Sequence, residues 1–321
     1  MTLIQLKYVL AVDTHRHFAQ AADSCFVTQP TLSMQINKLE KELDILIFDR
    51  SKHPVEPTEI GKKIIEQARK AIQESERISE IVQGSKGQIS GEFRMGIIPT
   101  VSTNLLPRFL KHVTEKYPEI RLRIEELQTD QIIDRLERDQ LDAGILATPL
   151  DRSGIIERPI YYEPFMAYVP VGHRLEKEDF VLHSELKLND MLLLKNGHCF
   201  RDSVINLCGA AFPEVKSNEK GLDFQSGNFE TLIKLADSGF GMTLLPYLMA
   251  LDLGEEERKR IKPIEHPQPT REISLVFSRA QLKIRIIDLL AEEIKAKIPS
   301  KLLKAEEQTV ISPKPMKRKS A

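Results

Sequence analysis

The chain has 321 residues, of which 41% are hydrophobic and 29% are charged, and its formal net charge is −1. This length predicts two or more domains, and the composition is that of an ordinary globular protein. No apolar run approaches the ~20 residues that a membrane-spanning helix needs, and the first residues lack the features of a signal peptide. We therefore expect a cytoplasmic protein that makes no membrane contact.

The first 58 residues predict a helix-turn-helix. Apolar residues recur at helical spacing in residues 3–10, and a second short helix covers residues 18–23. A third helix runs over residues 29–40, with Thr28 as its N-cap and Pro30 in its first turn. A short helix, a turn and a polar-faced helix form the arrangement that places a recognition helix in the major groove of DNA.

The polar face of this third helix is the candidate DNA interface. Hydroxyl and amide side chains can read base edges, and basic side chains can neutralise phosphates. The alternative is a solvated helix face with no ligand. A dimer would present two such helices about one DNA turn, ~34 Å, apart, so we expect a two-fold DNA target. The expected contact residues are Thr28, Gln29, Pro30, Thr31, Ser33, Gln35, Lys38 and Arg50.

A wing and a long helix follow. Two short strands in residues 46–50 and 55–58, around a turn at residues 52–54, would complete a winged domain over residues 1–58. Residues 59–85 predict a polar helix whose apolar stripe is too thin for it to fold alone, so we expect it to pair with a second chain. Residues 59–90 are thus a linker, ending in a hinge at residues 84–88.

Residues 91–300 predict an α/β domain. Strands and helices alternate in this region, which indicates a mostly parallel sheet with helices on its faces. The tail, residues 301–321, is rich in Pro and Lys near its end, and we expect it to be disordered. The clearest strands are residues 93–98, 121–126, 141–146, 165–169 and 273–277, and the clearest helices are residues 105–116 and 131–139.

Two of the three cysteines suggest redox chemistry. Cys199 lies between His198 and Arg201, at the start of a predicted helix, and Cys208 follows nine residues later. Positive charge and a helix N-terminus lower a thiol pKa, and the thiolate is the reactive form. A second thiol can capture an oxidised first one as a disulfide. The alternative is a pair of inert, buried cysteines.

The spacing of these cysteines predicts a conformational change. If residues 202–208 are helical, nine residues at ~1.5 Å rise separate the two α-carbons by up to ~13 Å. A disulfide needs roughly 4.4–6.8 Å. The helix must therefore unwind or bend if the two cysteines are to be joined. Cys25 lies among apolar residues and is interpreted as packing, and the cysteine spacing does not suggest a metal site.

Several segments resemble a known family. Residues 18–22, 28–33 and 35–40 are similar to the DNA-binding signature of LysR-type transcriptional regulators, and residues 197–202 with Cys208 resemble its hydrogen peroxide-sensing members. Residues 98–100, 128–129 and 241–246 add to this resemblance, which extends to about Lys297. It implies a winged helix-turn-helix, a linker helix and a regulatory domain of two α/β lobes like periplasmic binding proteins. It also implies a homodimer or homotetramer that binds promoter DNA and contacts RNA polymerase.

The resemblance also implies a peroxide pocket. Thr100 and Thr129 each follow a predicted strand, where their hydroxyls could contact a ligand, although a helix N-cap is the simpler interpretation. His198 could orient peroxide or could be an ordinary surface histidine. Asp223 precedes Phe224 where the relatives often carry a histidine, so the tuning of the thiol could differ. The expected pocket residues are Thr100, Thr129, His198, Arg201, Asp202 and Arg271, around Cys199 as the peroxidatic and Cys208 as the resolving thiol.

Two other functions remain open at this point. The chain could be a LysR-type regulator that binds a small co-inducer between its lobes, with incidental cysteines. It could also be a thiol peroxidase, against which the N-terminal helices argue. The leading hypothesis is a regulator of oxidative-stress defence genes that is not an enzyme and uses no cofactor.

Overall fold

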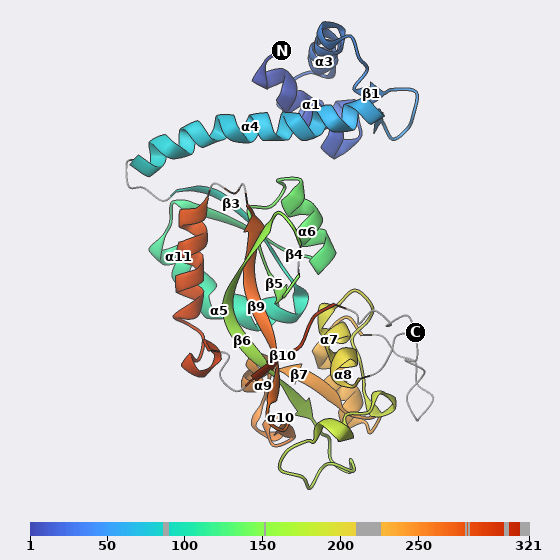
Figure 1. Ribbon diagram of the computed structural model, residues 1–321, viewed down its shortest axis with the longest axis vertical. Helices are drawn as coiled ribbons and strands as arrows, with labels where there is room; N and C mark the ends of the chain where they lie inside the picture. The colour runs from blue at the N-terminus through green and yellow to red at the C-terminus, as the bar shows by residue number, and fades with distance from the viewer. Residues whose placement is uncertain are drawn as a thin grey trace. The chain divides into compact units, whose positions relative to one another are not determined.

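The computed structural model of the chain describes residues 1–85, 90–150, 152–209, 226–279, 281, 283–304 and 308–314. The chain forms two compact units, Met1–Gln88 and Ile89–Ala321 (Figure 1). Among the described residues, no helix is long and apolar enough to cross a membrane.

The first unit begins with three helices, α1 (Leu3–His15), α2 (Phe18–Ser24) and α3 (Gln29–Leu43). The predicted start of α3 is confirmed, because the Thr28 hydroxyl accepts a hydrogen bond from the Thr31 amide. The apolar faces of the three helices meet in one buried cluster. This packing fixes the angle between α2 and α3.

The wing is present but shorter than predicted. Strands β1 (Phe48–Asp49) and β2 (Glu56–Pro57) pair antiparallel. The amide of Ile47, just before β1, donates instead to the buried Glu40 carboxylate at 2.8 Å. A side chain thus takes the place of a strand partner there, and pairing starts only at Phe48.

Helix α4 (Glu59–Ser85) has the predicted length of 27 residues. Its first half packs within its own chain, because Ile65, Ala68 and Ile72 are buried in the core of their own unit. Arg69 also pairs with Asp13 of α1. This half therefore packs within its own unit, and pairing of the helix with a second chain stays a prediction. Residues 84–85 of the predicted hinge belong to α4, and residues 86–88 of it lie outside the described residues.

The second unit is built on a mixed sheet. Strands β3 (Gly91–Ile97), β4 (Ile120–Glu126) and β5 (Ala143–Thr148) are parallel to one another, as predicted. Strands β6 (Ile155–Tyr168) and β9 (Gln268–Ser278) are antiparallel neighbours, and β9 is antiparallel to β5. The expectation of a mostly parallel sheet therefore holds for only part of the unit.

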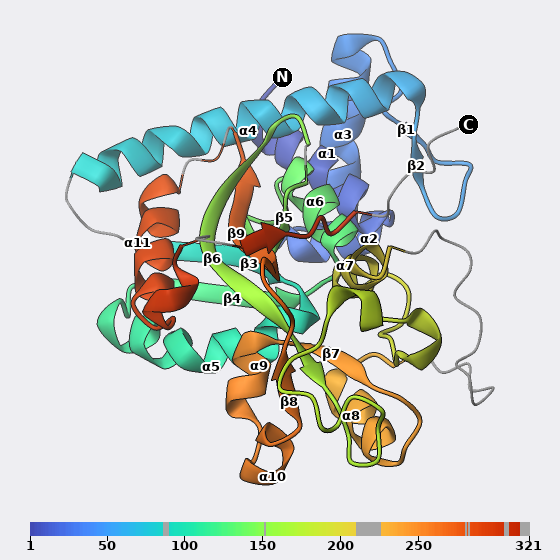
Figure 2. The same ribbon diagram turned by 60° about the horizontal axis from the view of Figure 1, so that its bottom comes forward.

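Strands β6 and β9 are long because they connect two lobes. Figures 1 and 2 show both strands running from the lobe of β3–β5 to the lobe of β7 (Thr243–Pro246) and β8 (Ile261–Pro263). The second half of β6 pairs with both β7 and β8. The strand order is β4-β3-β5-β9-β6-β7. Two strands that cross between lobes in opposite directions must lie antiparallel.

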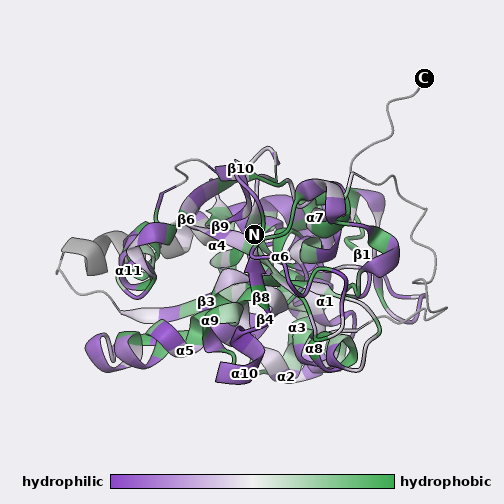
Figure 3. Ribbon diagram, turned by 90° about the horizontal axis from the view of Figure 1, so that it is seen from below, coloured by the Kyte–Doolittle hydropathy of each residue, from purple (hydrophilic) through white to green (hydrophobic). Residues whose placement is uncertain are grey.

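Helices cover the first lobe. Helix α5 (Pro99–Lys116) contacts α11 (Ile284–Lys295), whereas α6 (Thr129–Glu137) packs on the sheet. Figure 3 shows hydrophilic and hydrophobic residues alternating along α5 and α11, as expected for helices with one buried face. Gly144 allows the close approach of α6, because a Cβ atom there would meet the Ile132 side chain at 2.4 Å.

The second lobe has its own apolar cluster. It contains residues of β6, β7, α7 (Cys199–Leu207) and α8 (Phe229–Asp237), with the Phe200 ring between those of Phe165 and Phe229. The remaining elements are α9 (Tyr247–Asp252), α10 (Glu255–Arg258), and the short 3-10 helices η1 (His183–Glu185) and η2 (Leu188–Asp190). Helix α10 is hydrophilic throughout in Figure 3.

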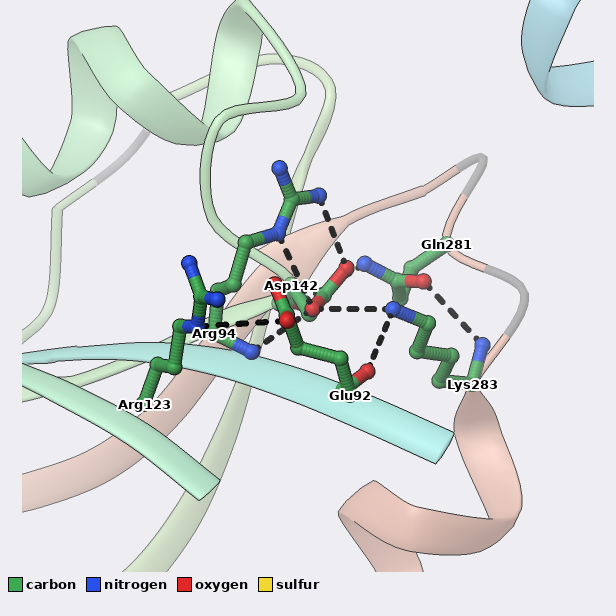
Figure 4. A network of polar contacts seen from close by, with 6 residues as sticks. All are labelled: Glu92, Arg94, Arg123, Asp142, Gln281 and Lys283. Carbon is green, nitrogen blue, oxygen red and sulfur yellow. Dashed lines mark hydrogen bonds and ion pairs between the residues drawn. The ribbon is translucent and has the colours of Figure 1, made fainter. Parts of the chain in front are cut away.

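A polar network fixes the end of the first lobe at which β3 begins (Figure 4). The buried Asp142 carboxylate accepts hydrogen bonds from the Arg94 amide at 2.7 Å and from Lys283 Nζ at 3.0 Å. Lys283 also donates to the Glu92 carbonyl, and Gln281 donates to the Asp142 carbonyl. Strands β3 and β5 and the start of α11 are thereby joined where the chain enters this unit.

The tail is more ordered than predicted. The 3-10 helix η3 (Ser300–Leu302) buries Leu302, and β10 (Gln308–Val310) pairs parallel with β9. The expectation of a disordered tail was therefore wrong for residues 308–314, because a β-branched run there, residues 309–311, adds a strand beside β9. Residues 315–321 lie outside the described residues.

Candidate redox site

Cys199 lies where the two lobes meet. It is the first residue of α7, two residues earlier than the predicted helix start, and its side chain is 8% exposed. Cys199 belongs to the apolar cluster of the first lobe, whereas its neighbours Phe200 and Val204 belong to that of the second lobe. The thiol thus joins the cores of both lobes at the N-terminus of a helix.

The cation that acts on this thiol is Arg271 of β9, which is buried and lowers the pKa of Cys199. Its guanidinium donates to the Thr100 hydroxyl at 3.1 Å and to the Thr100 carbonyl at 2.9 Å. It also makes two hydrogen bonds, of 2.9 and 2.7 Å, to one carboxylate oxygen of Glu163. Arg271 therefore connects α5, β6 and β9 behind the sulfur.

Burial nevertheless has the largest effect on the pKa of Cys199. Desolvation raises the pKa of Cys199 above its ordinary value, and the nearby Asp202 carboxylate raises it further. Arg271 and Thr129 act in the opposite direction but do not outweigh burial. A neighbouring cation does lower the pKa of Cys199, as expected, but the net shift is upward because burial has the larger effect.

His198 and Arg201 are not the cations of the site. Burial, with a smaller contribution from Lys195, lowers the pKa of His198, so its ring is neutral at pH 7. Arg201 donates from Nη1 to the Leu194 carbonyl at 3.0 Å and anchors α7 to the preceding loop. The two residues adjacent in sequence thus have other roles, and the charge comes from a strand 72 positions away.

Thr100 and Thr129 lie at the starts of α5 and α6, but neither is an N-cap. The N-cap residues are Ile98 and Gln128. Thr129 lies close enough to Cys199 for its hydroxyl to favour the thiolate, although its buried Oγ1 makes no hydrogen bond of standard geometry within the described residues. The simpler N-cap interpretation of these residues is excluded.

Unpartnered polar atoms remain around the sulfur. His198 Nε2, like Thr129 Oγ1, is buried and lacks a hydrogen-bond partner in the described part of the chain. Such atoms are costly to bury unless something binds them. Thr129 acts directly on the Cys199 thiol, and His198 precedes Cys199 in the chain.

Gly197 and Gln128 hold the loop before α7 against the first lobe. Gly197 has a φ of +93°, which favours glycine, and a Cβ atom there would lie 2.7 Å from the Gln128 side chain. From the sequence, Gln128 was noted only as part of a segment that resembles the LysR-type family, and Glu163 was not identified. A charged residue within the apolar strand 160–168 is the signal that could have identified Glu163.

Asp202 is the acidic member of the site. Burial raises its pKa to about 6, with a further contribution from Asp130 in the first turn of α6. Asp202 lies in the first turn of α7, three residues after Cys199. Its charge therefore changes within the pH range in which proteins are commonly assayed.

Cys208 lies at the other end of α7, where it is the C-cap residue. It packs against the apolar cluster of the second lobe, and burial raises its pKa to about 12. All three cysteines are free thiols. The predicted helix between the two cysteines is present, because α7 runs from Cys199 to Leu207. Asp223 lies outside the described residues.

The residues of the candidate DNA interface differ in exposure and in their contacts. Thr28, Gln29, Pro30, Thr31 and Lys38 are exposed on α3, whereas Ser33 and Gln35 are half-buried. Gln35 accepts a hydrogen bond from Gln5. Arg50 donates to Ser33 and to the buried Glu40, and it lies over the Phe18 ring. Arg50 therefore anchors the wing to α3 inside its own unit.

Cys25 is half-buried against the core of the first unit, in agreement with a packing role. Among the described residues, no group of three or more His, Cys, Asp or Glu side chains could hold a metal ion.

Known proteins share both units. Residues 3–62 match the bacterial regulatory helix-turn-helix protein, lysR family, and residues 86–298 match the LysR substrate binding domain. The DNA-binding transcriptional dual regulator OxyR of Escherichia coli is 33% identical over 314 residues, which cover 97% of this chain and 100% of that protein. The hydrogen peroxide-inducible genes activator of Haemophilus influenzae is 33% identical over 277 residues, 86% of this chain and 90% of that protein.

Solved structures of OxyR proteins have a similar fold. A full-length OxyR variant of Pseudomonas aeruginosa matches with a TM-score of 0.77 at 32% identity, over 92% of this chain and 95% of that one. A Corynebacterium glutamicum OxyR mutant with bound H₂O₂ matches with a TM-score of 0.60 at 26% identity, over 98% of each chain. The chain belongs to the LysR family of bacterial regulatory helix-turn-helix proteins, and the relatives described here are its OxyR members.

Proposed function

We propose that this protein is a DNA-binding transcription regulator that senses hydrogen peroxide through Cys199 and stores the signal as a reversible Cys199–Cys208 disulfide. The Cys199 sulfur attacks one peroxide oxygen and the O–O bond breaks, which leaves a sulfenic acid and releases water. The Cys208 sulfur then attacks Cys199, and a second water leaves as the S–S bond forms. Each peroxide molecule is thus reduced by the two thiols together.

The observation that carries the proposal is the setting of Cys199. A buried thiol at a helix N-terminus has the ion-paired Arg271 guanidinium and the Thr129 hydroxyl acting on it, and the buried His198 Nε2 of the preceding residue has no hydrogen-bond partner among the described residues. Peroxide can both donate and accept hydrogen bonds, so it fits these atoms. Hydroxyl donors placed beside a departing oxygen stabilise the charge that develops on it.

A neutral signal molecule suits this pocket. Burial raises the pKa of Cys199, which lowers the share of the reactive thiolate. Peroxide enters uncharged, and Arg271 favours the thiolate once the proton leaves.

The output follows from the disulfide geometry. Cys199 and Cys208 cannot be joined while α7 is intact, so oxidation must remodel a helix that belongs to the core of the second lobe. Such a change can alter how subunits associate. We propose that the protein works as a homodimer or homotetramer in the cytoplasm, binds two-fold promoter sites through α3, contacts RNA polymerase and controls oxidative-stress defence genes.

The test compares promoter footprints of reduced and peroxide-treated protein. The wild type is expected to give two different footprints, and Cys199→Ser only the reduced one. Cys25→Ser is the matched control, because it removes a thiol from the first unit. Mass spectrometry after stoichiometric peroxide should find the linkage between residues 199 and 208. Cys199→Ser behaving like the wild type would contradict the sensor and favour a regulator that binds a small co-inducer.

A further inference from the structure

The last described residues form a segment that lies across the redox site. We name residues 308–314 the C-terminal strap. Its first part, β10, pairs with β9 in parallel register, with Val310 opposite Thr270. The Ile311 amide continues this pairing by donating to the Thr270 carbonyl at 2.8 Å. The strap is thereby fixed beside the residue that precedes Arg271.

Beyond β10 the strap contacts α7. The Asn206 side-chain amide donates to the Ser312 carbonyl at 3.0 Å and to the Lys314 carbonyl at 2.6 Å. Ser203 Oγ lies 3.5 Å from the same Ser312 carbonyl, a weaker contact. Between these contacts Pro313 is buried. Two backbone carbonyls of the strap are therefore held by one side chain of α7.

Apolar contacts support these hydrogen bonds. Ile311 is half-buried and packs against the apolar cluster of the second lobe, the same cluster to which Val204 and Cys208 contribute. The strap thus binds to the lobe core and to the helix at once. Its attachment depends on α7 staying helical, because Ser203 and Asn206 lie on a common face only at helical spacing.

The contacted residues lie between the two cysteines. Asn206 is two residues before Cys208, inside the segment that must unwind before a disulfide can form. Unwinding moves the Asn206 amide away from the two carbonyls that it binds. The two hydrogen bonds from Asn206 to the strap are therefore contacts that disulfide formation must break.

We propose that the C-terminal strap holds α7 in its helical, reduced conformation, and that Asn206 is the positioning residue through which the strap opposes the resolving step. This inference rests on the proposed function. In that step the Cys208 sulfur bonds to the Cys199 sulfur, the S–O bond of the sulfenic acid breaks, and the oxygen leaves as water. The first step, attack of Cys199 on peroxide, requires no unwinding and is independent of the strap.

The test uses the full-length protein and four variants. Asn206→Ala removes the amide, and a chain ending at residue 307 removes the strap. A chain ending at residue 314 is the matched control, because it loses only the residues after the strap. Asn206→Asp adds an isosteric variant that cannot donate to the two carbonyls.

Three measurements are made on each variant: hydrogen exchange of α7 in the reduced protein, the rate of sulfenic acid formation on Cys199, and the rate of disulfide formation. Loss of two hydrogen bonds is expected to raise both the α7 exchange and the disulfide rate about tenfold, since each bond contributes modestly. Sulfenic acid formation should not change. Exchange of α5 reports whether the variant remains folded, and Asn206→Ala in the chain ending at residue 307 should add nothing further.

The outcomes separate the two proposals. If disulfides form at the same rate in the chains ending at 307 and 314, the strap has no such role and the inference is overturned. If the chain ending at 307 accelerates both steps equally, the strap acts on the whole fold and the inference is likewise overturned. If no variant and no wild-type sample forms the 199–208 linkage, the proposed switch itself is wrong, whatever α7 exchange shows.

Discussion

The two ends of α7 carry the same functional group in opposite surroundings. At the first end, Cys199 is surrounded by groups that act electrostatically, among them Arg271, Thr129 and Asp202. At the other end, Cys208 lies in an apolar cluster, and burial alone accounts for its raised pKa. The contrast indicates that the first thiol is tuned to react with a small oxidant, whereas the second is kept inert until the helix between them opens.

Replacing Arg271 by Met should have the largest effect on this contrast. The variant loses the charge that favours the Cys199 thiolate, so the rate of peroxide oxidation should fall about tenfold or more. It also leaves the Glu163 carboxylate buried without its partner, which should cost about 3 kcal/mol of unfolding free energy. Stopped-flow oxidation and urea unfolding measure the two effects. Unchanged oxidation in a folded variant would remove Arg271 from the site.

The pH dependence of Cys199 follows from its raised pKa. A thiol with a raised pKa is mostly protonated at pH 7, so its thiolate fraction should increase about tenfold for each pH unit until the pKa is approached. Alkylation of Cys199, measured in Cys25→Ser with Cys208 also replaced by serine, should rise accordingly between pH 7 and 8.5. A rate that is flat over this range would mean that the thiol is already ionised.

Replacing Thr129 by Val removes a hydroxyl that favours the thiolate while keeping a β-branched shape. We expect oxidation to slow about tenfold, the value of one hydrogen bond to a charged group. Thr114→Val on the exposed side of α5 is the control. Equal rates in the two variants would leave Thr129 with only a packing role.

Replacing Asp202 by Asn should have the smallest effect. Removing a charge that raises the pKa of Cys199 should speed oxidation a few-fold at pH 7.5, and the gain should shrink below pH 6. The folded pKa of about 6 lies above the ordinary value of 3.8, so ionisation of Asp202 destabilises the wild type as pH rises through this window. The variant should therefore gain relative stability above pH 6, measured by urea unfolding, and none below pH 3.8. Slower oxidation would instead identify Asp202 as a proton donor.

Local signals predicted much of the fold. The N-cap at Thr28 defines the start of α3, and the ranges of α4, β3 and β4 follow from their periodicity. The crossing of β6 and β9 was not predictable in the same way, because strand direction depends on pairing between segments about 110 residues apart in sequence. The strap was missed because its flanking Pro and Lys residues outweighed a three-residue β-branched run.

In the redox site, too, the contacts between residues far apart in sequence were not predictable. Cys199 and Cys208 were identified by their own sequence context, and Thr100 and Thr129 by their positions after strands. Arg201 was assigned to the thiol because it is near in sequence, yet it binds the Leu194 carbonyl. The charge comes from Arg271, which the family resemblance placed in the pocket and whose orientation is set by Glu163 on another strand. Adjacency in sequence does not fix the direction of a side chain that packs across lobes.

The intact helix between the thiols also limits the amount of peroxide to which the protein can respond reversibly. A sulfenic acid on Cys199 persists until α7 opens, and during that interval a second peroxide molecule competes with Cys208 for the same sulfur. Further oxidation gives a sulfinic acid, which cannot return to the thiol by simple exchange. Because helix opening is independent of peroxide concentration whereas the competing reaction is proportional to it, a large excess of oxidant should inactivate the protein permanently where a small amount switches it.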